Sequence, residues 1–379
     1  MRAAVLEATW DPHDGSEPPN CGRATDASRA FRDPTLTITQ RDRPEPGPND
    51  ALVRVRYAGI CGSDLSLLET DETGYVHYAA YASLPTVLGH EFAGEVVELG
   101  KNVTGFAVGD PVTAEVTAYC GRCPTCKRGH HGHCDRFEQL GFTVDGAFAE
   151  YVVVPERLLW NVASLANRYE ERDQLLRAAA LIEPATISYH GLFRRARAVD
   201  PGGYHVYHGL GPIGLTGMGI SRATGAARVV GFDPQPERLA VARDLGFEYV
   251  FDPGSDQVAV IDRVTDGDGA DVHVETAGAV DHTYPVIADT LADGATVVHI
   301  SNAGTAASIN LREYQAASAQ IVGAEGHTGQ GVYPRVIRLV AAGRFDPLPM
   351  VTNVYPLADA AAAVGQARKR LDGKVLLAC

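Results

Sequence analysis

The chain of 379 residues lacks any apolar stretch of the about 18 or more residues that a membrane-spanning helix requires. Its first residues, 1–7, lack the apolar core of a signal peptide. It also lacks an excess of positive charge, because 33 Lys and Arg stand against 47 Asp and Glu and give a formal net charge of −14. Such a charge argues against nucleic acid or an anionic membrane as partner. We therefore expect a cytoplasmic protein that binds neither nucleic acid nor a membrane.

The seven cysteines are not accompanied by a secretory signal. Disulfides are rare in the cytoplasm, so we expect reduced thiols that can bind metal. A hydrophobic content of 45% with 21% charged residues is typical of a globular protein. A chain of 379 residues exceeds one ordinary core, and two domains are expected.

Two short segments carry a first group of candidate metal ligands, Cys61-Gly-Ser63-Asp64 and Gly-His90-Glu91. A catalytic zinc needs three protein ligands and one open position, and it accepts thiolate, imidazole and carboxylate. Cys61 and His90 supply two ligands, and Glu91 or a carboxylate further along the chain supplies the third. Ser63 is suited to transfer a proton to or from a bound oxygen, and Asp64 to orient the imidazole of His90. A lone Cys and a lone His are also common core residues, so this interpretation depends on the rest of the chain.

The first half of the chain has the pattern of short strands separated by turns, which predicts a barrel-like, largely antiparallel domain. Residues 9–35 are rich in turn formers and are interpreted as an excursion. Residues 69–83 carry three tyrosines that either line a polar substrate pocket or pack as a surface loop. A helix is predicted over 169–182, ended by Glu183-Pro184, and Glu183 is a candidate remote zinc ligand or base.

Four cysteines within a short loop form the strongest metal motif. Their spacing is Cys120-x2-Cys123-x2-Cys126-x7-Cys134. Four thiolates can close a tetrahedral zinc site, which stabilises a fold and does no chemistry. An iron–sulfur cluster is the alternative for such a spacing.

The pattern changes after residue 203 to alternating strands and helices. A strand over 204–208 leads into Gly209-x-Gly211-x-x-Gly214, then into an apolar helix, and a second strand ends at Asp233. In this context the glycines admit a pyrophosphate to the helix N-terminus, and the acid binds the ribose 2′-hydroxyl of NAD. Asp233 favours NAD over NADP, although Arg238 lies close to it in the sequence. The predicted cofactor-binding residues are Gly209, Gly211, Pro212, Ile213, Gly214, Asp233 and Arg238.

Further strand and helix patterns follow this motif over 271–278, 296–300, 319–323 and 333–342, and a last strand lies at 374–378. The predicted fold class is α/β, with a mostly β catalytic domain and a doubly wound Rossmann domain for the dinucleotide. The predicted limits are 1–185 with 329–379 for the first domain and 186–328 for the second.

With these motifs in place, the chain resembles the zinc-containing medium-chain alcohol and polyol dehydrogenases, whose catalytic domain is GroES-like. The resemblance runs nearly end to end and is carried by the combination of motifs, which are Cys61-Gly-Ser-Asp, Gly89-His-Glu, the four-cysteine loop 120–134, Glu183-Pro, Gly209-x-Gly-x-x-Gly and Asp233. It implies two zinc ions per chain, one catalytic and one structural, and a homo-tetramer or homo-dimer.

The resemblance also implies roles for individual residues. Catalytic zinc is expected on Cys61, His90 and a carboxylate, with Glu183 and Glu91 the candidates. Alcohol dehydrogenases have a second Cys where this chain has Glu183, and the polyol and sugar members have a Glu, so the chain is more similar to the latter. Glu115 matches an acid that faces substrate hydroxyls in that branch, and Ser66 stands where many alcohol dehydrogenases have a relay His.

The expected activity is hydride transfer between a secondary alcohol with neighbouring hydroxyls (a polyol, sugar or cyclitol) and NAD. Zinc would act as a Lewis acid on the substrate oxygen, and Ser63 would take the hydroxyl proton. Two alternatives keep the enzyme but change the substrate to a simple alcohol or aldehyde, or to a thiol adduct of an aldehyde. A further alternative is a dinucleotide-binding module without turnover, in which Cys61, Ser63 and His90 would not be needed together.

Overall fold

The computed structural model describes residues 1–13, 23–24, 26–304 and 306–379. The described chain forms two compact units. Unit 1 consists of Met1–Glu183, Asn353–Lys369 and Val375–Cys379, and unit 2 of Pro184–Thr352 and Arg370–Lys374. Part of the predicted excursion over 9–35, namely 14–22 and 25, lies outside the described residues.

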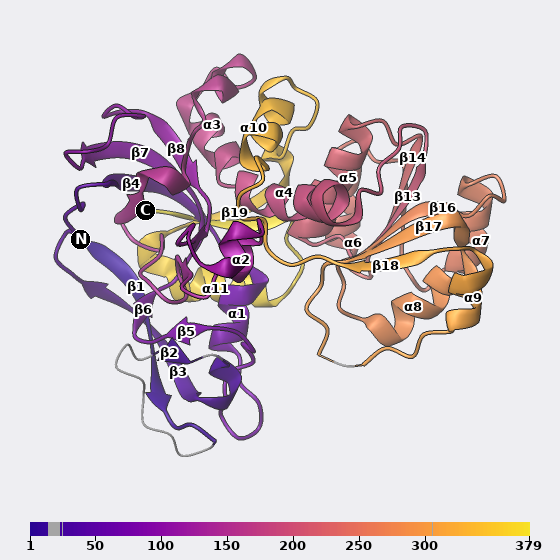
Figure 1. Cartoon of the computed structure of the whole chain (residues 1–379), viewed down its shortest axis with the longest axis horizontal. Helices are drawn as coiled ribbons and strands as arrows, with labels where there is room; N and C mark the ends of the chain where they lie inside the picture. The colour runs from indigo at the N-terminus through magenta and orange to yellow at the C-terminus, as the bar shows by residue number, and fades with distance from the viewer. Residues whose placement is uncertain (14–22, 25, 305) are drawn as a thin grey trace. The chain divides into compact units, whose positions relative to one another are not determined.

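Unit 1 is built mainly of short strands (Figure 1). Its strands are β1 (Arg2–Trp10), β2 (Arg23–Ala24), β3 (Phe31–Gln40), β4 (Asp50–Gly59), β5 (Ala82–Ser83), β6 (Thr86–Val87), β7 (Glu91–Leu99), β8 (Pro111–Ala114), β9 (Thr117–Ala118), β10 (Glu138–Gln139), β11 (Tyr151–Pro155), β12 (Leu159–Asn161), β19 (Val351–Pro356) and β20 (Lys374–Ala378). Its helices are α1 (Gly62–Leu68), α2 (Pro124–Lys127), α3 (Arg172–Ala179) and α11 (Ala360–Arg368).

The main sheet of unit 1 has the order β12-β8-β7-β4-β20-β19, and β11 pairs with β4 as well. The pairs of β4 with β7, β11 and β20 are antiparallel, as predicted for this half of the chain. A smaller sheet has the order β3-β1-β6. One hydrophobic core joins the two sheets and includes Leu6, Val53, Phe92 and Phe148. This core supports the loops at the ends of β4 and at the start of β7, where the candidate metal ligands lie.

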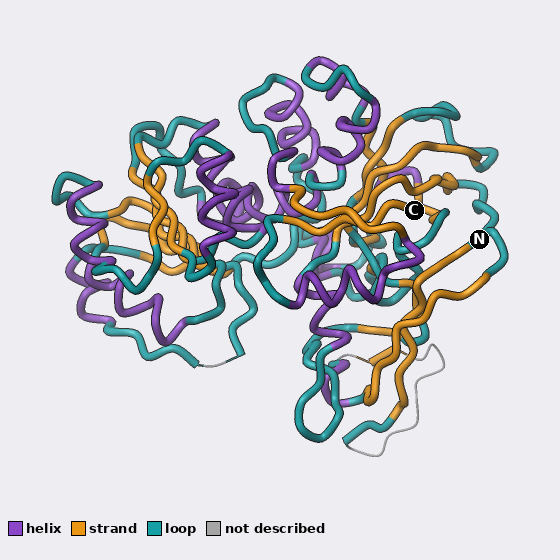
Figure 2. Tube along the Cα trace, turned by 180° about the vertical axis from the view of Figure 1, so that it is seen from behind, coloured by secondary structure: helices purple, strands orange, loops and turns teal. Residues whose placement is uncertain are grey.

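Unit 2 is a parallel sheet with helices on both faces. Its strands are β13 (Tyr204–His208), β14 (Arg228–Phe232), β15 (Tyr249–Phe251), β16 (Ala270–Glu275), β17 (Leu291–His299) and β18 (Gln320–Gly323). Its helices are α4 (Ile182–Tyr189), α5 (Pro212–Ala223), α6 (Pro236–Asp244), α7 (Gln257–Val264), α8 (Val280–Asp289), α9 (Leu311–Ala316) and α10 (Tyr333–Ala341). Figure 2 shows the strands of this sheet side by side with helices around them.

The sheet order of unit 2 is β15-β14-β13-β16-β17-β18, with every pair parallel. Counted from its own first strand, this is the order 3-2-1-4-5-6 of dinucleotide-binding doubly wound folds. In such sheets the ligand binds outside the carboxyl ends of the strands, where the strand order reverses. The reversal here lies between β13 and β16, directly at the end of the strand that leads into Gly209. The predicted α/β fold class is confirmed.

Two sequence predictions about helices and limits differ from the structure. The predicted single helix over 169–182 is wrong at its C-terminal end, because α3 ends at Ala179 and α4 begins at Ile182 and contains Glu183 and Pro184. A proline is tolerated in the first turn of a helix, where its missing N–H has no intrahelical partner. Glu183 therefore lies in the first turn of a helix and not at the end of one.

The second limit between the units also lies elsewhere than predicted. The sequence set the return to the first domain at residue 329, whereas unit 2 extends to Thr352. The cause is packing within unit 2. A Cβ atom at Gly219 of α5 would lie only 2.3 Å from the ring of Phe345, so the segment after α10 lies directly against α5.

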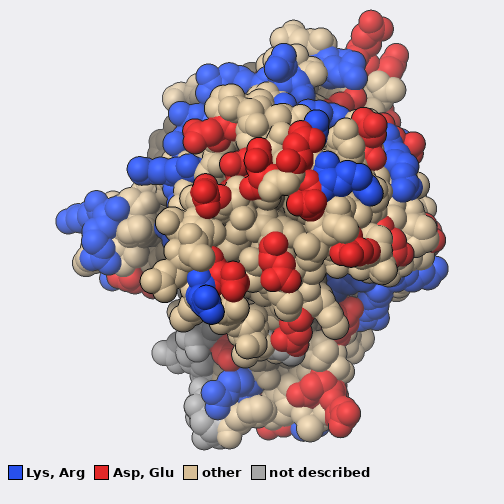
Figure 3. Space-filling view, turned by 90° about the vertical axis from the view of Figure 1, so that its right-hand side faces the viewer, with Lys and Arg blue, Asp and Glu red and all other residues tan. Residues whose placement is uncertain are grey.

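Among the described residues, none of the helices combines the length and the apolar character that crossing a membrane needs. Figure 3 shows acidic and basic side chains interspersed over one face of the molecule. The described part of that face therefore presents no continuous basic surface.

Candidate active site and metal centres

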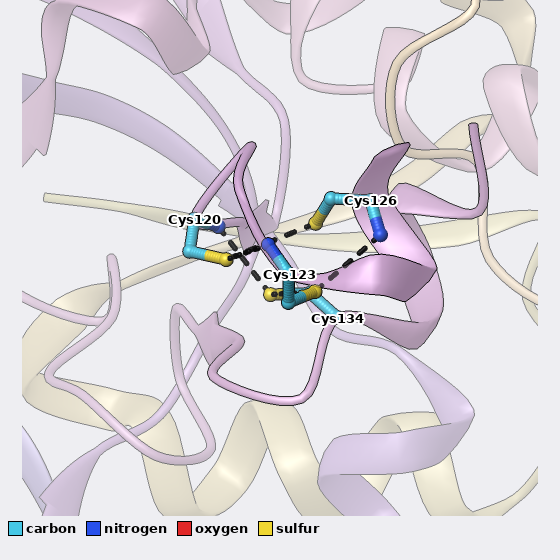
Figure 4. A group of neighbouring side chains, drawn as sticks. All are labelled: Cys120, Cys123, Cys126 and Cys134. Carbon is cyan, nitrogen blue, oxygen red and sulfur yellow. Dashed lines mark hydrogen bonds between the residues drawn. The ribbon is translucent and has the colours of Figure 1, made fainter. Parts of the chain in front are cut away.

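The four-cysteine loop brings its four sulfur atoms together (Figure 4). The Sγ atoms of Cys120, Cys123, Cys126 and Cys134 all lie within 4.8 Å of one another. The separation is 4.0 Å between the sulfurs of Cys120 and Cys126 and also between those of Cys123 and Cys134. A tetrahedral zinc with Zn–S bonds of about 2.3 Å requires sulfur separations of about 3.8 Å. The four sulfurs therefore fit a closed zinc site.

Backbone N–H groups surround these sulfurs. The N–H of Cys123 donates to Sγ of Cys120 at 3.4 Å, that of Cys126 to Sγ of Cys123 at 3.4 Å, and that of Cys120 to Sγ of Cys134 at 3.3 Å. The backbone N–H groups of Arg122 and Cys123 lower the pKa of Cys120 to about 6. Thiolate is the form that binds metal, so these backbone donors favour the metal-binding form of Cys120. Burial acts in the opposite direction on Cys126 and raises its pKa to about 12.

A second group of ligand atoms lies at the start of α1 and of β7. One ligand atom each from Cys61, His90 and Glu91 lies within 4.8 Å of the others. Cys61 is the N-cap of α1 and is half-buried, while His90 and Glu91 are buried. Sulfur, imidazole nitrogen and carboxylate oxygen are a donor set that zinc accepts, and three such ligands leave a fourth position open.

The Asp64 carboxylate organises this group from the first turn of α1. Its Oδ2 accepts a hydrogen bond from the Cys61 N–H at 2.8 Å, and its Oδ1 lies 3.5 Å from Nδ1 of His90. Nε2 of His90 is on the other edge of the ring, 3.4 Å from Oγ of Ser63. One fully buried carboxylate thus accepts from the Cys61 backbone and lies beside the His90 ring. Its role in orienting that ring stays a prediction.

The charge of Asp64 also acts on the protonation of His90. Burial lowers the pKa of His90, but the Asp64 carboxylate and the Cys61 sulfur together raise it by more, and the pKa lies well above its ordinary value. Metal binds neutral imidazole, so metal binding at His90 must displace a proton.

Gly89 fixes the backbone that presents His90. Its φ is +92°, and a Cβ at this position would lie 2.2 Å from Cδ1 of Phe148. Its carbonyl accepts a hydrogen bond from the N–H of Ala147 at 2.8 Å. Only glycine meets both demands, because other residues rarely adopt a positive φ and carry a side chain that Phe148 excludes.

The glycine turn of unit 2 has the geometry of a dinucleotide site. Gly209 has a φ of +97°, and a Cβ there would lie 2.8 Å from the backbone nitrogen of Ala277. Gly211 is the N-cap of α5, with Pro212 in its first turn. A Cβ at Gly214 would lie 2.0 Å from the carbonyl oxygen of Gly209. The free N–H groups at the start of α5 are thus left accessible to a pyrophosphate.

Asp233 lies beside this turn, at the end of β14. Its Oδ2 accepts from the N–H of Leu210 at 2.8 Å, and its Oδ1 accepts from the N–H of Gln235 at 2.9 Å. Arg238 reaches Oδ2 at 3.4 Å, and only 16% of its side chain is exposed. Burial lowers the pKa of Arg238. Asp233 and Arg238 therefore form one ion pair at the place where the adenine-side ribose binds in this fold.

Two family models match this chain. Residues 47–164 match the family model described as alcohol dehydrogenase GroES-like domain, and residues 212–342 match the one described as zinc-binding dehydrogenase. The scyllo-inosose 3-dehydrogenase of Thermotoga maritima is 37% identical over 362 residues, which cover 90% of this chain and 91% of the relative. The chain belongs to the zinc-containing medium-chain alcohol and polyol dehydrogenases.

Other comparisons agree with this family. A sorbitol dehydrogenase of Halalkalibacterium halodurans is 35% identical over 248 residues, which cover 65% of this chain and 67% of the relative. A solved structure from Thermotoga maritima, named as an alcohol dehydrogenase, has a TM-score of 0.94 at 32% identity, with full coverage of both chains. The protein is therefore an oxidoreductase with a GroES-like and a Rossmann-type domain, and zinc and a nicotinamide dinucleotide are the cofactors of its family. The predictions of family, fold class and enzyme are confirmed.

Three further residues singled out in the sequence, Glu183, Glu115 and Ser66, lie in different surroundings in the structure. Glu183 is buried in the first turn of α4, but it is not among the described residues whose ligand atoms lie within 4.8 Å of one another around Cys61. Glu115 is 5% exposed, and its Oε1 accepts a hydrogen bond from the indole of Trp160 at 3.1 Å. Oγ of Ser66 donates to the carbonyl of Gly62 at 3.1 Å, within its own helix.

Sequence reasoning missed a second anchor of the glycine turn. Oγ1 of Thr276 donates to the carbonyls of Gly209 at 2.8 Å and His208 at 3.0 Å. Glu275, which has no exposed surface, accepts from the N–H groups of Ala277 and Gly278 at 3.1 and 3.0 Å. These residues end β16 beside the turn. The signal in the sequence that could have identified them is an acid, Glu275, at the carboxyl end of the apolar strand pattern over 271–278.

Proposed function

We propose that this dehydrogenase oxidises a secondary alcohol that carries neighbouring hydroxyl groups, such as a cyclitol, sugar or linear polyol, and reduces NAD. The observation that carries the substrate class is the similarity to a scyllo-inosose 3-dehydrogenase over nine-tenths of the chain. The buried carboxylate of Glu115 supports it, because a carboxylate can accept hydrogen bonds from hydroxyls. A site built to bond hydroxyls rejects analogues that lack them, since its buried polar groups would be left unpaired.

Two zinc ions per chain are part of the proposal. The closed one would be held by Cys120, Cys123, Cys126 and Cys134, and the catalytic one by Cys61, His90 and a carboxylate. Zinc at the second site would supply Lewis acidity that lowers the pKa of the substrate hydroxyl.

Ser63 and Asp64 would carry out proton transfer and the orientation of His90. Ser63, whose Oγ is 3.4 Å from Nε2 of His90, is suited to take the hydroxyl proton. Asp64 holds the His90 ring in one orientation through Nδ1. Hydride transfer requires the donor carbon of the substrate and the nicotinamide ring to be held in contact.

Metal analysis tests the ligands. His90→Ala or Cys61→Ala should leave about one zinc per chain, the closed one, in a folded and inactive protein. The third ligand is distinguished by a matched pair, Glu91→Gln and Glu183→Gln, of which the variant of the true ligand loses catalytic zinc. The proximity of Glu91 to Cys61 and His90 favours Glu91. Full activity in a variant without the catalytic zinc would contradict the mechanism.

NAD is proposed over NADP because of Asp233. Its buried carboxylate can accept a hydrogen bond from a ribose hydroxyl and would repel a 2′-phosphate. Arg238 offsets part of this charge, at 3.4 Å from the carboxylate. The preference is therefore expected to be clear without being absolute.

The decisive experiment for the substrate is a reduction screen with the purified protein. NAD and NADP are each offered with polyols, aldoses, cyclitols and plain secondary alcohols. We expect turnover of the hydroxyl-rich compounds and poor turnover of 2-butanol, and Glu115→Ala should lose kcat/KM mainly on polyols. Fast turnover of a plain alkanol with none on any polyol would overturn the proposal.

We also propose a cytoplasmic location, in which the thiols stay reduced.

Self-association into a dimer or tetramer is a further part of the proposal. β18 is the edge of the parallel sheet in unit 2, and it is exposed along most of its length, with Ile321 38% exposed. An open strand edge with apolar side chains is a template for pairing with another chain. Sedimentation of the purified protein tests it, and a monomer at micromolar concentration would contradict it.

A further inference from the structure

The two segments that interrupt the strand pattern of unit 1 fold against each other. β2, from the first segment, pairs with β5, from the second, with Arg23 opposite Ser83 and Ala24 opposite Ala82. The N–H of Ala27 donates to the carbonyl of Ala80 at 3.0 Å. We call the described parts of these segments, residues 23–24, 26–35 and 69–83, the insertion lobe.

The first segment fixes the backbone of Tyr78. The N–H of Ser28 donates to the carbonyl of Tyr78 at 2.9 Å. Ser28 is held in turn by Asp26, whose Oδ1 accepts from both its N–H and its hydroxyl. Further along the lobe, the N–H of Val76 donates to the carbonyl of Phe31 at 3.1 Å. The first segment therefore serves as a backbone support for the second.

Aromatic rings connect the lobe to the candidate zinc ligands. The ring of Tyr78 stacks on that of Phe142 at 5.0 Å between centroids and 11° between planes. The ring of Phe142 lies 4.8 Å from the imidazole of His90. The N–H of Ser83 donates to the carbonyl of Phe142 at 2.9 Å, which ties the two loops together. All of these residues belong to unit 1.

Tyr78 is the outer member of this series of rings. Phe142 is 3% exposed and His90 is 5% exposed, whereas Tyr78 is half-buried and retains accessible surface. A substrate held by one oxygen beside His90 extends several bond lengths beyond it. Of the three rings in this series, only that of Tyr78 retains accessible surface, so a substrate that extends past Phe142 would contact it.

We infer that the Tyr78 ring, which the insertion lobe holds in place, forms a wall of the substrate site and contacts the C–H face of a cyclic polyol. This inference rests on the proposed function. A cyclic polyol carries hydroxyls around its rim and C–H groups on its faces, so it needs hydrogen-bond partners at the edge and an apolar surface at the face. Tyrosine supplies a large, rigid apolar surface with a polar end. A linear secondary alcohol with few carbons covers much less of such a ring.

The chain provides a matched control for this wall. Tyr81 has the same side chain, lies in the same segment and packs edge-on against Phe137 at 4.8 Å. Removing either tyrosine deletes a similar aromatic contact, but only Tyr78 stacks on the ring that contacts His90.

The test compares Tyr78→Ala, Tyr78→Leu and Tyr81→Ala in the full chain, with myo-inositol and 2,3-butanediol as substrates. We expect Tyr78→Ala to lower kcat/KM for myo-inositol at least about tenfold and to change that for 2,3-butanediol much less. Tyr78→Leu, which keeps bulk without the ring face, should shift the ratio in the same direction, and Tyr81→Ala should leave it unchanged. Zinc content and the shift of melting temperature caused by myo-inositol are measured in parallel. Zinc content should stay at the parent value, and the myo-inositol shift should shrink only in the Tyr78 variants.

The outcomes separate this inference from the proposed function. A parent protein that reduces NAD with neither myo-inositol nor any other polyol refutes the proposed function, and the inference falls with it. A parent that is active on polyols, with the same substrate ratio in both Tyr78 variants, refutes the inference alone. If Tyr78→Ala loses zinc or unfolds, Tyr78→Leu decides, and an unchanged ratio in that variant refutes the wall.

Discussion

Two neighbouring strands of unit 2, β13 and β16, carry buried histidines that should make the stability of this unit depend on pH. His205 on β13 and His273 on β16 have no exposed surface. Nδ1 of His205 lies 2.8 Å from the hydroxyl of Ser221. Burial lowers the pKa of His205 and that of His273 to about 4 each. The pKa of His208 also lies well below its ordinary value, mainly because the ring is buried and to a smaller extent because His273 lies beside it.

The sign of the effect follows from proton linkage. The unfolded chain binds these protons with a pKa of about 6.5, so below that pH it binds more protons than the native unit. The contribution of these histidines to the stability of unit 2 is therefore fully present above a pH of about 6.5 and is lost as the pH falls toward about 4. At pH 5, a pKa of about 4 in the folded state corresponds to a loss of about 2 kcal/mol for each such histidine.

His205→Asn tests this magnitude. The amide can replace Nδ1 as partner of the Ser221 hydroxyl and does not titrate. Urea unfolding is measured at pH 7 and pH 5 by far-ultraviolet circular dichroism, which includes unit 2. Tryptophan fluorescence follows unit 1 separately, because both tryptophans, Trp10 and Trp160, lie there. Between pH 7 and pH 5 the variant should lose about 2 kcal/mol less unfolding free energy than the parent.

Release of zinc in acid affects the parent and the variant alike, so the difference between them isolates the histidine. His282→Asn is the control, since His282 is exposed on α8 of the same unit. It should lose as much stability as the parent. If the parent and His205→Asn lose equal free energy between the two pH values, the argument from burial is wrong.

Three further substitutions have defined outcomes. Gly89→Ala should destabilise unit 1 by about 2 kcal/mol or more, because of its positive φ and the contact with Phe148, and should lower zinc occupancy at His90; unchanged urea unfolding and metal content would contradict this. Cys123→Ser should remove one zinc and lower the melting temperature, since a closed site contributes folding free energy; a variant that melts like the parent would refute a structural role. Asp233→Ala should narrow or reverse the preference for NAD over NADP, measured as the ratio of the two kcat/KM values, by up to about 1.5–3 kcal/mol. If the variant keeps the kcat/KM values of the parent with both cofactors, another acid contacts the ribose.

The local motifs were predictable from the sequence because their geometry is set over a few residues. In the four-cysteine loop, the N–H of Cys123 donates to Sγ of Cys120, and that of Cys126 to Sγ of Cys123. A spacing of two residues between cysteines therefore brings both sulfurs and their backbone donors together without help from the rest of the fold. The turn at Gly209 is local in the same sense, since it joins the end of β13 to the start of α5.

Long-range pairing was not predictable in this way. Nothing near Arg23 in the sequence points to its partner Ser83, and the pairing of β2 with β5 depends on tertiary contacts. The same holds for the extension of unit 2 to Thr352, which results from packing of the segment around Phe345 on α5. The error at Pro184 has a different cause. Proline both ends helices and begins them, and only the neighbouring chain decides between the two.

Gly89 and Gly209 have the same physical role in two unrelated sites. Their φ values are +92° and +97°, and a Cβ would meet the Phe148 ring at 2.2 Å in one case and the Ala277 backbone nitrogen at 2.8 Å in the other. Each glycine lets a loop approach a packed neighbour closely and then directs the functional group that follows, the His90 side chain or the N–H groups at the start of α5. A cysteine and a histidine without such a backbone are ordinary core residues. Gly89 is therefore needed to present the His90 side chain, just as the imidazole of His90 is needed to bind the metal.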